Sequence, residues 1–253
     1  MRIRGIAFAI FITAGLAAGL WWTDGLGEPA EGAPPYAEAD LEPPDDPYAW
    51  VREWRRPEGP PRVGLQAGHW KNDEVPEELN RLVGNTGSSS GGYAEWEVNL
   101  KIAQETKNIL KQRGVEVDIL PATVPPKYWT DAFLAIHADG SLDKSKSGYK
   151  FAHPRRDFTG GADRLTEILY ETYGKATGLA VDLNVTRNMR GYYAFAWWRY
   201  EHAVHPMTTA VIAETGFLTN PSDRRVLVDK TEAVAQGLAS GIINFLTERN
   251  LLE

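Results

Sequence analysis

The sequence lacks cysteine entirely and holds only five histidines among its 253 residues. Without cysteine the chain cannot form disulfides, cysteine-ligated zinc fingers or iron–sulfur clusters, and it cannot use a thiol as a nucleophile. The histidines are His69, His137, His153, His202 and His205. A metal site in this protein would therefore combine histidine with aspartate or glutamate.

Positive charge is also scarce, with 27 Lys and Arg against 34 Asp and Glu and a net charge of −7. This balance excludes a generally basic protein that coats nucleic acid, so we expect no nucleic-acid partner. The excess acid lies near the N-terminus, because residues 1–60 hold 5 basic and 10 acidic side chains. With 43% hydrophobic residues, the chain has enough apolar side chains for a folded core.

An uncharged run of 18 residues, 5–22, follows Arg2 and Arg4. Its length is near the lower limit for crossing a bilayer, and the arginines favour a cytoplasmic N-terminus. Small residues at positions 14–19 also fit a signal-peptidase site. We expect residues 1–22 to form an apolar helix that serves as a signal peptide or a membrane anchor. Either alternative places the rest of the chain outside the cytoplasmic membrane, in the periplasm or the cell wall.

The next segment has the composition of a tether. Residues 23–49 carry eight acidic residues, six prolines and no basic residue. Such a composition favours a solvated chain over a packed one, so we expect residues 23–60 to form an acidic, proline-rich, disordered linker.

Residues 61–253 alternate between strand-like and helix-like patterns, which predicts a single α/β domain. We expect strands at 62–67, 115–120, 133–138 and 208–213, and helices at 95–113, 163–173 and 223–249. This alternation is typical of a mostly parallel, twisted sheet with helices on both faces. In such sheets the ligand site lies beyond the carboxyl ends of the strands.

Residues able to carry chemistry stand at these strand ends. His69, His137 and Glu214 each end or follow a predicted strand, and Glu95 begins the first predicted helix. Two imidazoles and a carboxylate suit a zinc ion with one position open to water, and a second carboxylate can transfer a proton. Each residue also has a structural alternative: a solvent-facing histidine, a glutamate at a helix N-terminus, or a glutamate in a buried ion pair.

Four segments occur in an informative order along the chain. They are Arg62–Trp70 with a Gly-His turn, Glu95–Ala103 with Glu-x-x-x-Asn-Leu, Asp131–Gly140 with a second histidine, and Ala210–Asn220 with Glu-x-Gly-Phe-x-x-Asn. Together they resemble the zinc-dependent N-acetylmuramoyl-L-alanine amidases of bacteria (amidase type 3). The resemblance implies a phosphorylase/hydrolase-like fold, with residues 61–253 as a zinc amidase catalytic domain.

The same resemblance implies residue roles. His69, Glu95 and His137 would bind one zinc ion, and Glu214 would be the catalytic carboxylate. The implied reaction is hydrolysis of the amide between N-acetylmuramic acid and the L-alanine of the stem peptide, by zinc-bound water with Glu214 as general base and acid. The implied partners are peptidoglycan or muropeptides, and the sequence does not identify a protein activator.

The chain departs from the family pattern around the first histidine. The family usually has Asp-Pro-Gly-His-Gly-Gly, whereas residues 66–71 read Gln-Ala-Gly-His-Trp-Lys. The histidine is kept but the glycines after it are lost, so we expect Trp70 to narrow the cleft or to stack on sugar. Residues 71–92 form a longer insert than the family leads us to expect. Glu97 is a rival ligand, but the four-residue offset to Asn99 favours Glu95.

Further along, arginines and aromatic residues lie close together between 187 and 198. Such residues suit recognition of sugar faces and peptide carboxylates, and we expect Arg190 to hold a stem-peptide carboxylate. The resemblance adds Asn220 as a substrate-binding residue. For Phe195 we favour packing in the core.

Three other features keep alternatives open. Residues 87–91 match G-x-S-x-G with Ser89 as a nucleophile, but the residues before them make a poor central strand, which favours a loop. His202 and His205 are spaced to share a metal on a helix, although Pro206 favours a loop. The competing functions are a non-catalytic peptidoglycan-binding domain on the same fold and another cell-wall hydrolase, of the serine or the carboxypeptidase type.

Overall fold

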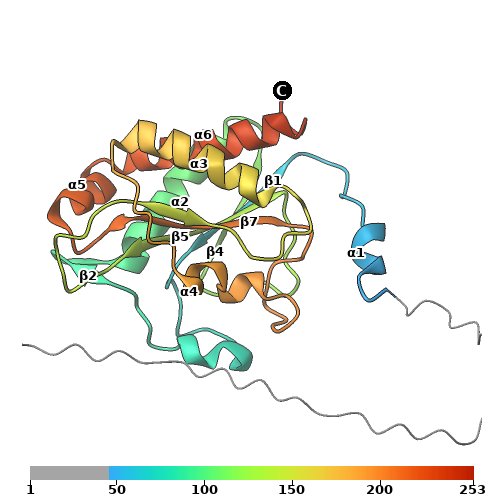
Figure 1. Ribbon diagram of the computed structural model, residues 1–253, viewed down its shortest axis with the longest axis horizontal. Helices are drawn as coiled ribbons and strands as arrows, with labels where there is room; N and C mark the ends of the chain where they lie inside the picture. The colour runs from blue at the N-terminus through green and yellow to red at the C-terminus, as the bar shows by residue number, and fades with distance from the viewer. Residues whose placement is uncertain (1–45) are drawn as a thin grey trace, which may run out of the picture. The chain divides into compact units, whose positions relative to one another are not determined.

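A five-stranded sheet runs through the protein in the order β4–β1–β5–β7–β6 (Figure 1). The computed structural model describes residues 46–253, so the expected helix at 1–22 and the linker up to residue 45 lie outside the described residues. The strands are β1 (Arg62–Ala67), β4 (Glu116–Leu120), β5 (Ala132–Asp139), β6 (Lys150–Ala152) and β7 (Thr209–Phe217). No helix within residues 46–253 is long and apolar enough to span a membrane.

The sheet is mostly parallel, as the sequence predicted. β1 pairs in parallel with β4 and β5, β5 pairs in parallel with β7, and β6 runs antiparallel to β7. The long apolar run of β5 follows from its central place, because a strand covered on both faces excludes water from successive side chains. The sequence did not reveal β6, which has three residues and begins with a buried lysine.

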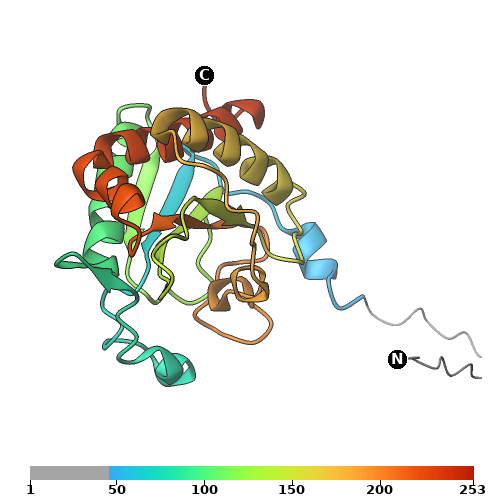
Figure 2. The same ribbon diagram turned by 60° about the vertical axis from the view of Figure 1, so that its left-hand side comes forward.

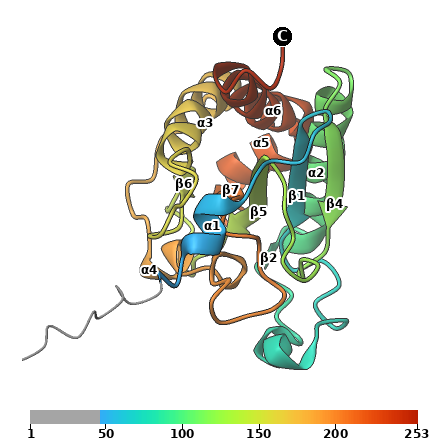
Figure 3. The same ribbon diagram turned by 90° about the vertical axis from the view of Figure 1, so that its right-hand side faces the viewer.

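The long helices cover one face of the sheet. They are α2 (Glu95–Lys111), α3 (Ala162–Thr177), α5 (Pro221–Asp229) and α6 (Thr231–Glu248). Figure 1 and Figure 3 show α3 and α6 together on one side of the strands, and α2 contributes to the same hydrophobic core. Their apolar stripes form one core with the strand residues that point to that face, such as Leu65, Leu134 and Val211.

The opposite face is covered by shorter helical elements, so the helices expected on both faces are present, long on one face and short on the other. These elements are η1 (Glu77–Leu82), α4 (Arg187–Arg190) and η2 (Tyr193–Phe195). Leu79, Met189 and Phe195 are buried beneath them in a second core. The predicted core position of Phe195 is thereby confirmed. This is also the face on which the candidate site opens.

The insert at 71–92 contains η1 and the first strand of a short hairpin, β2 (Ser89–Ser90) and β3 (Tyr93–Ala94). Figure 2 shows the η1 segment, in teal, extending away from the sheet. Ser89 is exposed on this hairpin and does not follow a central strand. Because a serine nucleophile of the G-x-S-x-G type needs that strand, the serine alternative is excluded at this position.

The end of the expected linker is folded against the domain. Residues 47–60 contain α1 (Ala49–Glu53), and Trp54 packs on Trp129 with 5.2 Å between ring centroids. Arg56 forms a two-pronged ion pair with Asp131, at 2.6 and 2.9 Å. The expectation of a disordered linker up to residue 60 is therefore wrong for residues 47–60. The prediction followed the acidic, proline-rich composition of the whole segment and did not weigh the aromatic side chains and the arginine that bind its last part to the domain.

Candidate active site

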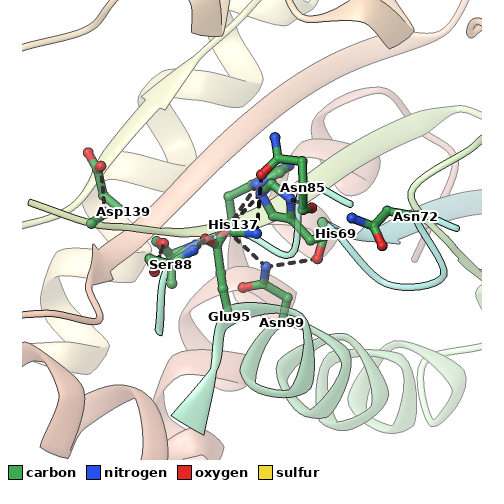
Figure 4. A network of polar contacts seen from close by, with 12 residues as sticks. His69, Asn72, Asn85, Ser88, Glu95, Asn99, His137 and Asp139 are labelled. Atoms are coloured by element: carbon green, nitrogen blue, oxygen red, sulfur yellow. Dashed lines mark hydrogen bonds and ion pairs between the residues drawn. The ribbon is translucent and has the colours of Figure 1, made fainter. Parts of the chain in front are cut away.

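The predicted histidines and Glu95 come together at one edge of the sheet (Figure 4). His69 follows β1, His137 lies near the end of β5, and Glu95 begins α2 on the helical side. Gly68 lies against the His137 ring, where any Cβ atom would collide with it. His69 itself has a φ of 65°, which is uncommon for a residue with a side chain and is typical of functional turns.

Three donor atoms converge in this cluster. Glu95 Oε1 lies 3.4 Å from His69 Nε2 and 3.1 Å from His137 Nδ1. One ligand atom from each residue fits within 4.8 Å of the others, and the two imidazole rings meet edge to face with centroids 4.9 Å apart. Two nitrogens and one carboxylate oxygen form a donor set that can hold a divalent metal, and zinc favours this set.

Glu95 is held as a carboxylate. Its side chain is buried, and it accepts hydrogen bonds from the backbone N–H groups of Ser88 at 2.7 Å and Ala138 at 3.2 Å. Burial by itself raises the pKa of Glu95, but the hydrogen bonds and charges of His137 and His69 outweigh it. The pKa of Glu95 is therefore well below its usual range. Burial alone would lower the pKa of His69, but the hydrogen bond and charge of Glu95, together with the hydrogen bond to Asn85, outweigh it and raise that pKa.

The four-residue offset between Glu95 and Asn99 has a structural purpose. Asn99 Nδ2 donates to Glu95 Oε1 at 3.3 Å and to the carbonyl of Gly68 at 3.2 Å, so one amide links the helix to the turn that carries His69. Glu97 lies on the exposed side of α2 and accepts from the backbone of Ala94 at 3.2 Å. The structure thus brings Glu95, rather than Glu97, to the histidines.

A chain of hydrogen bonds behind His137 determines which of its nitrogens faces the cluster. Gln66 Nε2 donates to the carbonyl of Ala122 at 3.0 Å, which leaves Gln66 Oε1 to accept from the hydroxyl of Tyr192 at 2.8 Å. Because that hydroxyl has a single hydrogen, its oxygen accepts from His137 Nε2, at 3.4 Å. In the neutral form that can bind a metal ion, His137 therefore carries its proton on Nε2 and has its Nδ1 lone pair available to the cluster. The 3.1 Å contact of Nδ1 with Glu95 Oε1 is a hydrogen bond only when Nδ1 is protonated.

His69 is fixed by the insert. Its Nδ1 donates to the carbonyl of Asn85 at 2.7 Å, which leaves Nε2 free to act as a ligand. Gly87, two residues on, has a φ of 75° and lies against His69 and Glu95, where a Cβ atom would collide with both side chains. The insert is thus part of the site wall. Neither its partner carbonyl nor its close-approach glycine has a signal that the sequence alone would reveal.

Glu214 lies in a row of residues that crosses three strands. In the register of the sheet it is paired with His137 of β5 on one side and with Lys150 of β6 on the other. Its Oε2 atom is withdrawn from solvent and accepts no hydrogen bond from the described residues. Burial, followed by the charges of Glu95 and Asp139, raises the pKa of Glu214 well above its usual value, while Lys150 acts in the opposite direction. Such a carboxyl group is suited to exchange a proton near neutral pH.

The three predicted substrate-binding residues, Trp70, Asn220 and Arg190, lie in different parts of the structure. Trp70 lines a cavity of about 510 Å³ together with His69 and Trp96. Asn220 caps α5: its Oδ1 accepts from the N–H groups of Ser222 and Asp223, and its Nδ2 donates to the carbonyl of Lys144 at 3.0 Å. These backbone contacts engage the amide of Asn220, which argues against the expected contact with substrate. Arg190 is exposed at the end of α4.

The pair His202 and His205 does not form a metal site. His202 Nδ1 contacts Glu78 at 2.8 Å, whereas the His205 ring packs on Trp50 and Trp54 at 5.7 and 5.5 Å between centroids. Within residues 46–253, the group of His69, Glu95 and His137 is the one in which three such side chains converge on a metal-sized space.

The comparisons with known proteins agree with this geometry. A family model described as N-acetylmuramoyl-L-alanine amidase matches residues 63–244. The chain belongs to the N-acetylmuramoyl-L-alanine amidase family. The family resemblance and the enzyme class that the sequence predicted are both confirmed.

Among characterised amidases, AmiA of Salmonella typhimurium is 25% identical over 235 residues, which cover 70% of this chain and 80% of AmiA. AmiA of Escherichia coli is 23% identical over 202 residues, 61% of this chain and 69% of its own length. Of the solved structures, amidase Ami1 from Mycobacterium smegmatis aligns with a TM-score of 0.54 and 16% identity, over 74% of this chain and 97% of Ami1. An amidase from Clostridium difficile 630 gives 0.52 and 17%, over 76% and 100%. These structural likenesses establish the amidase fold.

Proposed function

We propose that this amidase hydrolyses the amide bond between N-acetylmuramic acid and the L-alanine of the peptidoglycan stem peptide, with one zinc ion held by His69, Glu95 and His137. The observation that carries the proposal is the convergence of these three donors beside Glu214 in a member of the amidase family. A peptidoglycan substrate agrees with the names of the related amidases.

The residues present fit a zinc ion. The donors are two imidazole nitrogens and one carboxylate oxygen, and both histidines bond through their second nitrogen, to the carbonyl of Asn85 and to the hydroxyl of Tyr192. Partners of this kind fix the tautomer and the ring orientation of metal-binding histidines. When bound, zinc would supply Lewis acidity and make water acidic enough to attack a carbonyl near neutral pH.

Glu214 transfers the proton in this scheme. As the base it accepts the proton of the attacking water, and as the acid it gives that proton to the nitrogen of L-alanine, which leaves as an amine. Its raised pKa makes Glu214 a stronger base than an ordinary carboxylate, and its Oε2 has no competing hydrogen-bond donor among the described residues, so both observations support the proton transfer.

Trp70 is proposed to contact the sugar. The cavity that it forms with Trp96 reaches His69, so a ring bound there lies next to the donor cluster. Flat aromatic side chains match the apolar faces of a sugar ring. The expected site of action is outside the cytoplasmic membrane, with residues 1–22 as a membrane anchor or a cleaved signal peptide.

The test uses the zinc-loaded protein and an N-acetylmuramoyl peptide, with the products identified by mass spectrometry. A free L-alanine amine beside intact N-acetylmuramic acid is the expected pair of products, and a chelator should stop their formation. A peptide shortened at its C-terminus would instead indicate a carboxypeptidase. Binding without cleavage by a protein that contains zinc would favour a peptidoglycan-binding domain and would refute the proposal.

A further inference from the structure

A second cavity begins at Lys150, the neighbour of Glu214 in the sheet, on the side away from Trp70. It has a volume of about 330 Å³ and is lined by residues of β5, β6 and β7, among them Asp139, Lys150 and Phe217. In the sheet, Asp139 is paired with Phe217 two residues beyond His137, and Lys150 is paired with Glu214 itself. The cavity therefore begins at the same row of residues as the candidate catalytic carboxylate.

The two cavities lie on opposite sides of the central strand β5. The cavity of Trp70 and His69 is on the β1 side, whereas the cavity of Lys150 is on the β7 and β6 side. If the scissile amide bond is held at the donor cluster, the two parts of the substrate that it joins extend in opposite directions from the cluster. The sheet order thus offers one cavity for each half of the substrate.

The chemistry of the walls distinguishes these halves. The cavity on the β1 side presents Trp70 and Trp96. The wall on the β6 side is charged: Lys150 is buried and binds Asp139 at 2.7 Å and Asp182 at 2.6 Å, and Lys146 lines the same space. The N-acetylmuramoyl ring carries no charge once its carboxyl group is in the amide, but the stem peptide carries carboxylates.

The charged wall is built before any ligand arrives. Asp223 is fully buried and holds the loop before β6 through Ser147 Oγ at 2.6 Å and the N–H of Gly148 at 2.8 Å. It also accepts from the N–H of Phe217 at 2.9 Å, and Asn220 fixes the carbonyl of Lys144 in the same loop. Because the wall is already ordered, less conformational entropy is lost when a ligand binds.

We propose that this cavity is the subsite for the stem peptide, and that Lys146 binds a carboxylate of the residue that follows L-alanine. Lys150 is held between two carboxylates, Asp139 and Asp182, so its charge is not available to a ligand and it fixes both aspartates in place. Of the two lysines that line the cavity, Lys146 is the exposed one, and although its charge acts on Asp143 and Asp182, it has no carboxylate within ion-pair distance among the described residues. The inference rests on the proposed function.

The experiment compares two probes that differ only in charge: N-acetylmuramoyl-L-alanyl-D-isoglutamate and the same compound with its carboxylates converted to carboxamides. We expect the wild-type protein to show about a fivefold lower KM for the charged probe, the size of effect that a partly exposed ion pair supplies. Lys146→Ala should abolish this preference and Lys146→Glu should reverse it. Lys144→Ala is the matched control, because Lys144 is exposed in the same loop but does not line the cavity, and it should retain the preference.

Equal KM values for the two probes in the wild-type protein, or an unchanged preference in Lys146→Ala, would overturn the inference. Failure of the proposed function gives a different result, which is the absence of cleavage of both probes by the wild-type protein. In that case calorimetric titration of the same probes into the same variants decides the subsite alone. A preference for the charged probe that is lost in Lys146→Ala supports it, and equal binding of the two probes refutes it.

Discussion

Replacing Tyr192 with phenylalanine removes one hydroxyl from the chain of hydrogen bonds behind His137. That hydroxyl donates to Gln66 at 2.8 Å and accepts from His137 at 3.4 Å. Loss of a partner behind a metal-binding histidine typically costs 10- to 100-fold in metal affinity, and the 3.4 Å contact is long for a hydrogen bond. We therefore expect Tyr192→Phe to weaken zinc binding by about tenfold, the lower end of that range.

Tyr193→Phe is the matched control for this prediction. The side chain of Tyr193 is buried, and its hydroxyl contacts the same glutamine and the carbonyl of Ala122 but does not contact His137. Competition with a chromophoric chelator at constant pH measures the zinc affinity, and thermal unfolding of the zinc-free proteins separates changes in folding from changes in binding. If Tyr192→Phe bound zinc as tightly as the wild type, or if both variants lost affinity equally, the deduced orientation of His137 would be wrong.

Three further predictions concern the proton, the pH and the N-terminal segment. Glu214→Gln should keep its zinc, measured by metal analysis, and lose about 10²- to 10⁴-fold in kcat; near-wild-type turnover would remove Glu214 from the mechanism. Glu95 raises the pKa of His69, and zinc must displace the proton of the charged imidazole. Zinc affinity should therefore fall as the pH drops below this raised pKa, by up to about tenfold per pH unit. A zinc affinity that does not change between pH 6 and 8 would contradict this. Arg56→Met removes the bidentate ion pair with the buried carboxylate of Asp131 and should lower the free energy of unfolding, measured by urea titration, by about 1–2 kcal/mol. An unchanged free energy of unfolding would show that this ion pair does not anchor residues 47–60 to the domain.

The parts of the site that could be predicted from the sequence are those set by strand ends. His69, His137 and Glu214 follow or end strand-like runs, and parallel neighbours bring their carboxyl ends to one edge. Predicting Glu95 required a further observation, its four-residue offset to Asn99. The structure explains this offset, because the amide of Asn99 donates both to Glu95 and to the turn that carries His69. The family pattern then supplied roles that spacing alone left open.

The rest depends on contacts between distant segments that leave no local pattern. Gln66 was visible only as a departure from the family's usual aspartate, yet it contacts Tyr192, 126 residues away. Lys150 forms a strand too short for a periodic signal, and its partners Asp139 and Asp182 reach it from separate segments. Asn220 matched the family motif, but its amide bonds to backbone and holds a loop.

Digestion of purified peptidoglycan sacculi by the zinc-loaded protein and by Glu214→Gln, with zinc measured in both, tests the proposed reaction directly. We expect equal zinc in the two proteins and release of stem peptides with a free L-alanine amine, beside intact glycan strands, by the wild type alone. Sacculi left intact by a wild-type protein that carries its zinc, or equal release by both proteins, would contradict the proposed reaction.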